Sequence, residues 1–267
     1  MKTYTKEEIF AQLKSLGAPR DSVVLVHSSL RAVGKVEGGG QGFLDALISY
    51  FTDKGGLLLI PCHTWHRLDQ EITLDMTSSD NCLGALSTLA ASDTRGLRTE
   101  SPTHSVVIFG DREKAQRLAD GERGAITPTG VDTVYGRLYR EGGKVLLLGV
   151  GHNRNTYLHA VDEILKTPNR MEGEKSTPVA VKYPSGKVEK RELYLFYTDY
   201  TEDISDRFVK YEIPFRYHHC TEFGFVGNAP SQLCDCRKMK EVMEDIYKRS
   251  PFDPLKTEQP IQAKYYI

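Results

Sequence analysis

The sequence is poor in cysteine and has no long apolar run. Its 267 residues include five cysteines, an odd and unevenly spaced set in a chain without an export signal, which argues against a disulfide framework. No segment approaches the roughly 18 consecutive apolar residues that a membrane-spanning helix needs. We therefore expect a cytoplasmic protein with no membrane partner.

An excess of one charge sign is also absent. The chain has 35 Lys and Arg against 36 Asp and Glu, for a formal net charge of −1, which argues against a general nucleic-acid binder. The glycine-rich segment 34–42 lacks the lysine-threonine ending of a P-loop and the spacing of a dinucleotide fingerprint. No Gly-x-Ser-x-Gly motif occurs either. Nucleotide hydrolysis, dinucleotide binding and that class of serine hydrolase therefore have no support.

Short apolar runs alternate with amphipathic stretches over the first 150 residues. A capping-box pattern at Thr5 and Glu8 predicts a first helix that stops at Gly17. Buried strands are predicted at 23–26, 57–61, 106–109 and 144–150, helices at 43–51, 83–91 and 237–248, and an antiparallel hairpin from 177–183 and 188–197. We expect an α/β fold: a single layered domain over residues 1–267, with a mixed, partly parallel central sheet and an antiparallel C-terminal portion.

Polar side chains gather at three places where a strand ends or a helix begins. These are segments 27–29, 102–105 and 155–159. Each alone fits a structural role, because Ser, Thr and Asn cap turns and helices and His104 fits a half-buried core position. Ligands of α/β proteins bind beyond the carboxyl ends of the strands, so the three segments together indicate a site.

His159 has the clearest chemistry among these residues. A histidine titrates near neutral pH, so its imidazole can accept a proton from a reacting group. Asp162 or Glu163, one helical turn later, shares its helical face and could orient the ring. Many solvated helix faces carry such a pair, so the spacing alone fits both a catalytic and a structural role.

The order and spacing of these segments resemble one enzyme family. The segments are Val26–Leu30, Gly34 with Gly38 and Gly39, Leu59–Pro61, Arg98–Val106, Gly142–Val150 and Asn155–His159. Together they resemble the aminoglycoside 3-N-acetyltransferase family of antibiotic-resistance enzymes. The resemblance implies an acyltransferase with acetyl coenzyme A as donor and, as acceptor, the 3-amino group of a deoxystreptamine ring. It also implies an α/β fold distinct from the common GCN5-like acetyltransferase fold.

Carried over residue by residue, the resemblance assigns two loops to acetyl coenzyme A and His159 to catalysis. The implied cofactor-binding residues are His27, Ser28, Ser29, Gly34, Thr103, His104, Ser105 and Val106. His159 is the implied general base of a direct transfer. No metal is expected, because a base can remove the amine proton while hydroxyl or N–H groups stabilise the oxyanion.

Members of the family usually present a carboxylate to this histidine. The candidates here are Asp199, Glu202, Asp203 and, on the same helix as the histidine, Glu163. We choose Asp199 because it follows the end of the apolar stretch 193–197. Glu163 remains a second catalytic candidate.

Acceptor identity depends on weaker signals. Trp65, the only tryptophan, and Asp162 are the predicted substrate contacts, although a plain core or surface role fits Trp65 equally well. One alternative function is a coenzyme A-dependent N-acetyltransferase for a non-antibiotic amine. Another is a zinc-binding interaction protein built on 218–220, Cys234 and Cys236, whose spacing differs from that of structural zinc sites. The sequence leaves monomer and dimer open.

Overall fold

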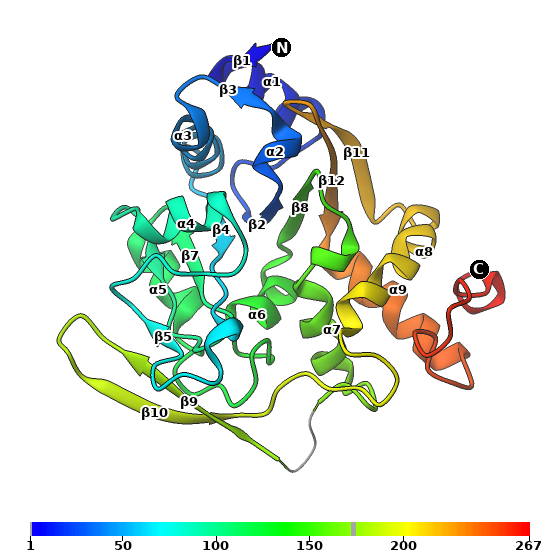
Figure 1. Ribbon diagram of the computed structural model, residues 1–267. Helices are drawn as coiled ribbons and strands as arrows, with labels where there is room; N and C mark the ends of the chain where they lie inside the picture. The colour runs from blue at the N-terminus through cyan, green and yellow to red at the C-terminus, as the bar shows by residue number, and fades with distance from the viewer. Residues whose placement is uncertain (1, 172–174) are drawn as a thin grey trace.

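The computed structural model describes residues 2–171 and 175–267 and is built around a seven-stranded mixed sheet (Figure 1). The strand order is β11-β12-β8-β2-β4-β7-β6. The strands are β2 (Val23–Ser28), β4 (Leu57–Pro61), β6 (Leu97–Arg98), β7 (Val106–Phe109), β8 (Lys144–Leu148), β11 (Thr221–Val226) and β12 (Ala229–Asp235). β2 runs parallel to both of its neighbours, and the other pairs are antiparallel. The sheet is therefore mixed and partly parallel, as predicted.

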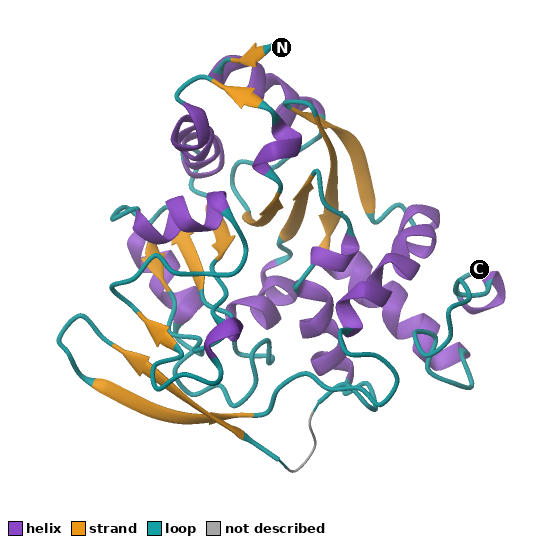
Figure 2. Ribbon diagram, in the orientation of Figure 1, coloured by secondary structure: helices purple, strands orange, loops and turns teal. Residues whose placement is uncertain are grey.

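The central strands are apolar at nearly every position because helices cover both faces of the sheet (Figure 2). Along β2, Val24 and Val26 belong to one buried cluster and Leu25 belongs to the other. Helices α1 (Lys6–Ser15), α3 (Gly39–Thr52) and α4 (Ala85–Ser92) supply the first cluster; α5 (Arg112–Ala119), α6 (Val134–Glu141), α7 (Tyr157–Leu165) and α9 (Cys236–Arg249) supply the second. The predicted layered arrangement follows from this double burial.

The first helix begins where its sequence pattern predicts. Glu8 N donates to Thr5 Oγ1 at 3.2 Å, and Thr5 N donates to Glu8 Oε2 at 2.9 Å, which completes the capping box. The helix ends at Ser15, and Gly17 follows with φ 77°. Local chemistry alone is enough to set both ends of this element.

The predicted hairpin forms, but outside the central sheet. β9 (Thr177–Lys182) and β10 (Val188–Leu193) pair antiparallel, and β9 pairs with the short β5 (Leu74–Asp75) in a separate three-stranded sheet. A further small sheet pairs β1 (Thr3–Tyr4) with β3 (Lys35–Val36). The antiparallel C-terminal part of the central sheet consists instead of β11 and β12, which the sequence analysis did not predict. β11 is the edge strand and β12 lies between it and β8, and both carry polar residues, so they lack the apolar signal of the central strands.

Three parallel strands end on the same side of the sheet, and short helices follow them. The short helices of the chain are α2 (Leu30–Val33), η1 (Trp65–Arg67), η2 (His152–Arg154), η3 (Ile204–Tyr211) and α8 (Glu212–Tyr217), with η4 (Ala263–Tyr265) near the C-terminus. Within residues 2–171 and 175–267, no helix is long and apolar enough to cross a bilayer. The carboxyl ends of β2, β4 and β8 therefore bring polar residues together at one edge.

Candidate functional site

A cavity of about 630 Å³ opens at this edge of the sheet. Its polar and charged lining residues are His27, Ser28, His63, Ser87, Thr103, His104, Asn153, Arg154, Asn155, Thr156, His159, Thr198, Glu202, Asp203 and Ser205. The strand ends and η2 supply one side, and the segment from Leu195 to Ser205, which leaves the β9–β10 hairpin, supplies another. All three polar segments singled out in the sequence contribute to this single cavity.

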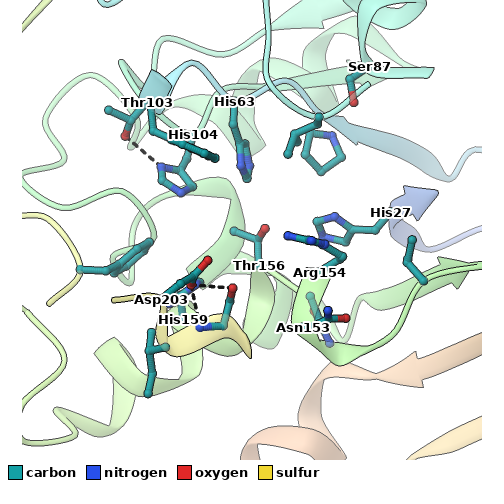
Figure 3. Close-up of a pocket in the computed structure, with 18 of the residues that line it drawn as sticks. His27, His63, Ser87, Thr103, His104, Asn153, Arg154, Thr156, His159 and Asp203 are labelled. Atoms are coloured by element: carbon teal, nitrogen blue, oxygen red, sulfur yellow. Dashed lines mark hydrogen bonds between the residues drawn. The ribbon is translucent and has the colours of Figure 1, made fainter. Parts of the chain in front are cut away.

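Four histidines line the cavity, and Figure 3 shows them pointing into it from different walls. Burial lowers the pKa of His27, His104 and His159 to about 3, and the pKa of His63 well below its usual value. All four rings are therefore neutral at physiological pH. A neutral imidazole can accept a proton on one nitrogen and donate a hydrogen bond from the other. The site can therefore supply both a proton acceptor and hydrogen-bond donors.

His159 projects from α7, and two aromatic rings hold it. Phe196 stacks on the imidazole with centroids 4.0 Å apart and planes 8° apart, and Phe208 meets it edge-on at 4.8 Å. Among the described residues, no carboxylate is hydrogen-bonded to the ring. Ring packing therefore sets the orientation of the imidazole where the sequence analysis expected an acid.

Asp162 does not reach the cavity. Its carboxylate accepts from Arg170 Nε at 3.1 Å and from Tyr247 Oη at 3.1 Å, and both members of the Asp162–Arg170 pair have side chains only 2% exposed. The predicted substrate contact therefore does not fit this position. Arg170 holds the Asp162 carboxylate in a buried ion pair. The spacing of residues along one helix cannot predict such a partner from another segment.

Glu163 holds a loop rather than His159. One carboxylate oxygen accepts from Thr129 N at 3.1 Å and Thr129 Oγ1 at 2.5 Å, and the other accepts from Thr127 Oγ1 at 2.5 Å. Its side chain is not among those that line the cavity. The catalytic role predicted for Glu163 is therefore at odds with its position.

Asp199 also lies away from the cavity lining. Its side chain is 56% exposed and accepts from Asn169 Nδ2 at 2.7 Å. Glu202 and Asp203, the alternatives from the same segment, do line the cavity, and Figure 3 shows the Asp203 side chain among the lining residues. Asp203 also accepts hydrogen bonds from Ser205 N and Oγ, so its carboxylate is fixed in place. Glu202 and Asp203 thus share the cavity with His159, whereas Asp199 does not.

Half of the predicted cofactor-binding residues reach the cavity. His27, Ser28, Thr103 and His104 line it. Ser29 does not, because its hydroxyl caps α2 by accepting from Ala32 N at 3.3 Å.

The other three lie behind the wall or elsewhere. Ser105 is fully buried and donates to Cys62 O at 2.6 Å, and Val106 is buried in β7. Gly34 ends α2 with φ 86° and lines a separate hollow beside Phe43. These positions support the fold around the cavity and make no direct contact with it.

The structure adds lining residues that the sequence analysis missed. His63 lies two residues beyond the end of β4. A polar residue just after a buried strand was the signal that marked the other segments, so the sequence could have identified His63 as well. Arg154 lies in the three-residue helix η2 and Phe196 follows β10 outside any named strand, so no periodic pattern marks either of them. Trp65 does line the cavity, with 48% of its surface exposed.

The described residues include neither a grouped set of metal ligands nor a disulfide. Within the part of the chain that the structure describes, no three His, Cys, Asp or Glu side chains are grouped to hold a metal ion. Cys62, Cys220, Cys234 and Cys236 are buried free thiols, and burial raises the pKa of Cys62 to about 12. A thiol in that state is protonated and is not a nucleophile at neutral pH.

Comparison with protein families gives one match over most of the chain. The model of the aminoglycoside 3-N-acetyltransferase family matches residues 25–248. Aminoglycoside N(3)-acetyltransferase III of Serratia marcescens is 30% identical over 262 residues, which cover 87% of this chain and 93% of that protein. Aminoglycoside N(3)-acetyltransferase IV of Salmonella is 32% identical over 168 residues, 62% of this chain and 61% of that protein.

Solved structures share the fold. The aminoglycoside acetyltransferase AAC(3)-IVa, as a histidine-to-alanine mutant in complex with a gentamicin, superposes with a TM-score of 0.80 at 24% identity, covering 97% of this chain and 93% of that one. AAC-IIIb, as a binary complex with CoASH, gives a TM-score of 0.75 at 21% identity, covering 90% and 94%. The architecture around the cavity is thus that of a known set of structures.

Proposed function

Because the chain belongs to the aminoglycoside 3-N-acetyltransferase family, we propose that it transfers the acetyl group of acetyl coenzyme A directly to an amine of an aminoglycoside-like acceptor, at the 3-amino group of a deoxystreptamine ring. The family resemblance predicted from the sequence motifs is confirmed, and so is a mixed α/β fold distinct from the GCN5-like one. The observation that carries the proposal is the position of His159, a neutral imidazole that lines the same cavity as Glu202 and Asp203. Acetyl coenzyme A is made inside cells, so this function also implies a cytoplasmic enzyme.

His159 acts as the general base. An ammonium ion has no lone pair, so the acceptor must lose a proton before its nitrogen attacks the thioester carbon. The C–N bond then forms, the carbonyl oxygen takes the electron pair, and collapse of this intermediate breaks the C–S bond. The thiolate of coenzyme A leaves and receives the proton from the imidazolium, and the second proton that the new amide nitrogen must lose goes to solvent. Asp203 and Glu202 supply the negative charge that stabilises that imidazolium while it exists.

The donor is proposed to bind along the wall made by His27, Ser28, Thr103 and His104. The cavity suits a polar ligand there, because His27 Nε2 is buried and has no hydrogen-bond partner among the described residues. A related enzyme that binds CoASH shares the fold, which supports this placement. A bound donor would satisfy the orphaned nitrogen.

The charges of the lining favour a second candidate acceptor. Glu202 and Asp203 are the only carboxylates among the described lining residues, and Arg154 is present as well. An aminoglycoside carries several ammonium groups, whereas this cavity offers two carboxylates beside the apolar surfaces of Trp65 and Phe196. A less highly charged, non-antibiotic amine is therefore the alternative acceptor for the same chemistry.

The test measures release of free thiol from acetyl coenzyme A with gentamicin and with a panel of singly charged amines. We expect His159→Ala to lose about two to four orders of magnitude in turnover while still binding acetyl coenzyme A, because removal of a positioned base has that effect. Asp203→Asn should lose less, and Asp199→Asn, its matched control on the exposed surface, should stay near wild type.

Three outcomes would contradict the proposal. If His159→Ala turns over at the wild-type rate, His159 is not the general base. If Asp199→Asn loses turnover and Asp203→Asn does not, Asp199 is the supporting acid, as predicted from the sequence. If no amine in the panel is acetylated, the proposed function is wrong.

A further inference from the structure

Two lining histidines, His63 and His104, take no part in the proton transfer derived above, although His104 belongs to the proposed donor wall. Their ring centroids are 4.3 Å apart with planes tilted by 47°, and both side chains are buried. They come from different strands, since His63 follows β4 and His104 precedes β7. In Figure 3 they lie side by side on the wall opposite His159.

Tyr135 fixes the tautomer of His63. The Tyr135 hydroxyl lies 2.7 Å from His63 Nε2 and has no other hydrogen-bond partner among the described residues. Tyr135 is fully buried, so its O–H must donate or remain unsatisfied, which costs about 1–3 kcal/mol. Burial, and after it the charge of Glu122, raises the pKa of Tyr135 well above its usual value, so the phenol keeps this proton. Nε2 therefore accepts, and the neutral ring of His63 carries its hydrogen on Nδ1.

Thr103 fixes His104 in the opposite tautomer. The Thr103 hydroxyl lies 2.9 Å from His104 Nδ1, Thr103 is fully buried, and its Oγ1 has no second partner within the described chain. The hydroxyl therefore donates to Nδ1 by the same reasoning. The hydrogen of the His104 ring is on Nε2.

The two rings thus present two N–H groups with no protein acceptor among the described residues, namely His63 Nδ1–H and His104 Nε2–H. Resting on the acetyl transfer proposed above, we propose that these two groups form an oxyanion site, in which both N–H bonds point at the thioester carbonyl oxygen. When the amine nitrogen attacks, the C=O π pair moves onto this oxygen, which accepts from both histidines. When the pair returns, the C–S bond breaks. His159 moves the proton, and His63 and His104 move none.

The histidines suit this role because they do not titrate. Burial lowers the pKa of His104 to about 3 and that of His63 well below its usual value, so neither ring competes with His159 for the acceptor proton at neutral pH. Donors fixed before the reaction stabilise developing charge without reorganisation, and loss of one such donor typically lowers turnover by about 10²- to 10³-fold. Tyr135 is then a positioning residue that acts through His63.

The first test reads the tautomers in the ligand-free protein, so it does not depend on acetyl transfer. Long-range ¹H–¹⁵N NMR correlations of the imidazoles at pH 7 should show His63 protonated on Nδ1 and His104 on Nε2. Tyr135→Phe should release His63 from the Nδ1–H form and leave His104 unchanged. His63 found protonated on Nε2 in the wild-type protein, or either ring found cationic, would overturn the proposal whatever the acceptor is.

The second test uses the geometry of amide side chains with acetyl coenzyme A and gentamicin as probes. An asparagine amide reaches the position of a histidine Nδ1, and a glutamine amide reaches that of Nε2. His63→Asn and His104→Gln should therefore retain most turnover, whereas His63→Gln and His104→Asn should lose about 10²-fold. Each pair differs by one methylene, so a folding defect would affect both members.

Controls separate this test from failure of the proposed function. His66→Ala, a histidine paired with Asp80 outside the cavity lining, should match wild type. Acetyl coenzyme A affinity by calorimetry should stay close to wild type in the two His63 variants, and turnover of the two His104 variants, which alter the donor wall, is compared at saturating acetyl coenzyme A. Equal turnover in all four, or a loss explained by donor affinity alone, overturns the oxyanion assignment. Absence of transfer in the wild-type enzyme instead rejects the proposed function, and the tautomer measurement still decides the arrangement of the two rings.

Discussion

At the scale of single residues, environment decides which of several similar side chains can act. Asp162, Glu163 and Asp203 all lie within the region that the sequence marks as catalytic. Asp162 accepts a hydrogen bond from Arg170, and Glu163 accepts one from Thr129. Of the three carboxylates, only that of Asp203 lines the cavity. The same kind of side chain therefore serves as an ion-pair partner, a loop anchor or a candidate for electrostatic support, according to what surrounds it.

Ser28 and Ser29 provide a test of this distinction. Ser28→Trp should abolish or strongly weaken acetyl coenzyme A binding, because Ser28 lines the cavity. Ser29→Ala should leave that affinity unchanged and lower the free energy of unfolding by about 1 kcal/mol, because Ser29 caps α2. Calorimetry and urea unfolding measure the two effects.

The opposite pattern would place the donor elsewhere. If Ser29→Ala weakens donor binding while Ser28→Trp binds normally, the cofactor follows the hydroxyl that the sequence resemblance assigned. It would then run beside α2 and outside this cavity.

At the scale of elements, one buried arginine ties distant parts of the chain together. Arg170 pairs with Asp162 of α7 and, at 2.8 Å through each of two nitrogens, with both carboxylate oxygens of Asp253. It also donates to Tyr247 Oη of α9 at 3.0 Å. The helix that carries His159 is therefore anchored to the segment before β9 and to the turn after α9.

Arg170→Met should lower the free energy of unfolding by about 3–5 kcal/mol, because it leaves buried carboxylates without their cation. Asp253→Asn should cost less, since Asp253 is partly exposed and the Asp162–Arg170 contact remains. Guanidinium unfolding monitored by circular dichroism measures both. Arg20→Met, which removes the exposed pair with Asp53, is the matched control and should change stability by less than about 1 kcal/mol.

Equal effects of Arg170→Met and Arg20→Met would contradict this account. The contribution of Arg170 would then be that of a solvated surface ion pair. Its network could not be what positions α7.

At the scale of the whole molecule, early and late parts of the chain share one sheet. β12, near the C-terminus, pairs with β8, which pairs with β2 near the N-terminus. We propose on this basis that residues 1–267 form one domain, as expected from the sequence. Such a domain should respond to pH as a unit.

The buried histidines predict a loss of stability in acid. Five of them are involved: His27, His63, His104, His152 and His159. Their folded pKa values are lowered by burial, for example to about 4 in His152, below an unfolded value near 6.5. Below pH 6.5 the unfolded chain binds protons that the folded protein does not, so stability is fully present above pH 6.5 and falls as the pH drops toward about 3–4.

Each histidine adds at most about 1.4 kcal/mol per pH unit to this slope. Glu122, Asp162 and Glu163 act in the opposite sense, because burial raises their pKa values, that of Glu122 to about 7, and the folded protein therefore binds their protons first. Five histidines outweigh these three carboxyl groups, so urea unfolding between pH 8 and pH 4.5 should show stability decreasing toward acid. A flat profile, or greater stability at pH 4.5, would show that these histidines are not buried and neutral.

Local sequence alone determined much of the framework. The capping box at Thr5, the buried strands from Val23 and Lys144, and the hairpin around Gly186 follow from periodicity and turn chemistry within a few residues. The order of the polar segments also identified the family, which the match over residues 25–248 confirms. These features could be predicted because their physical causes lie within single segments of the chain.

Tertiary structure decided which side chains face the cavity. His63 and Phe196 reach it because β4 and the segment after β10 meet there, although 133 positions separate them in the chain (196 − 63). The hydroxyls of Ser29 and Ser105 bind backbone groups outside the cavity lining. Asp203 lines the cavity, whereas Asp199, the acid expected from the sequence, does not. Spacing along the chain fixes a residue's position on its own element, but the rotation and packing of elements against one another determine which groups meet, because burial and hydrogen bonding are satisfied between segments far apart in sequence.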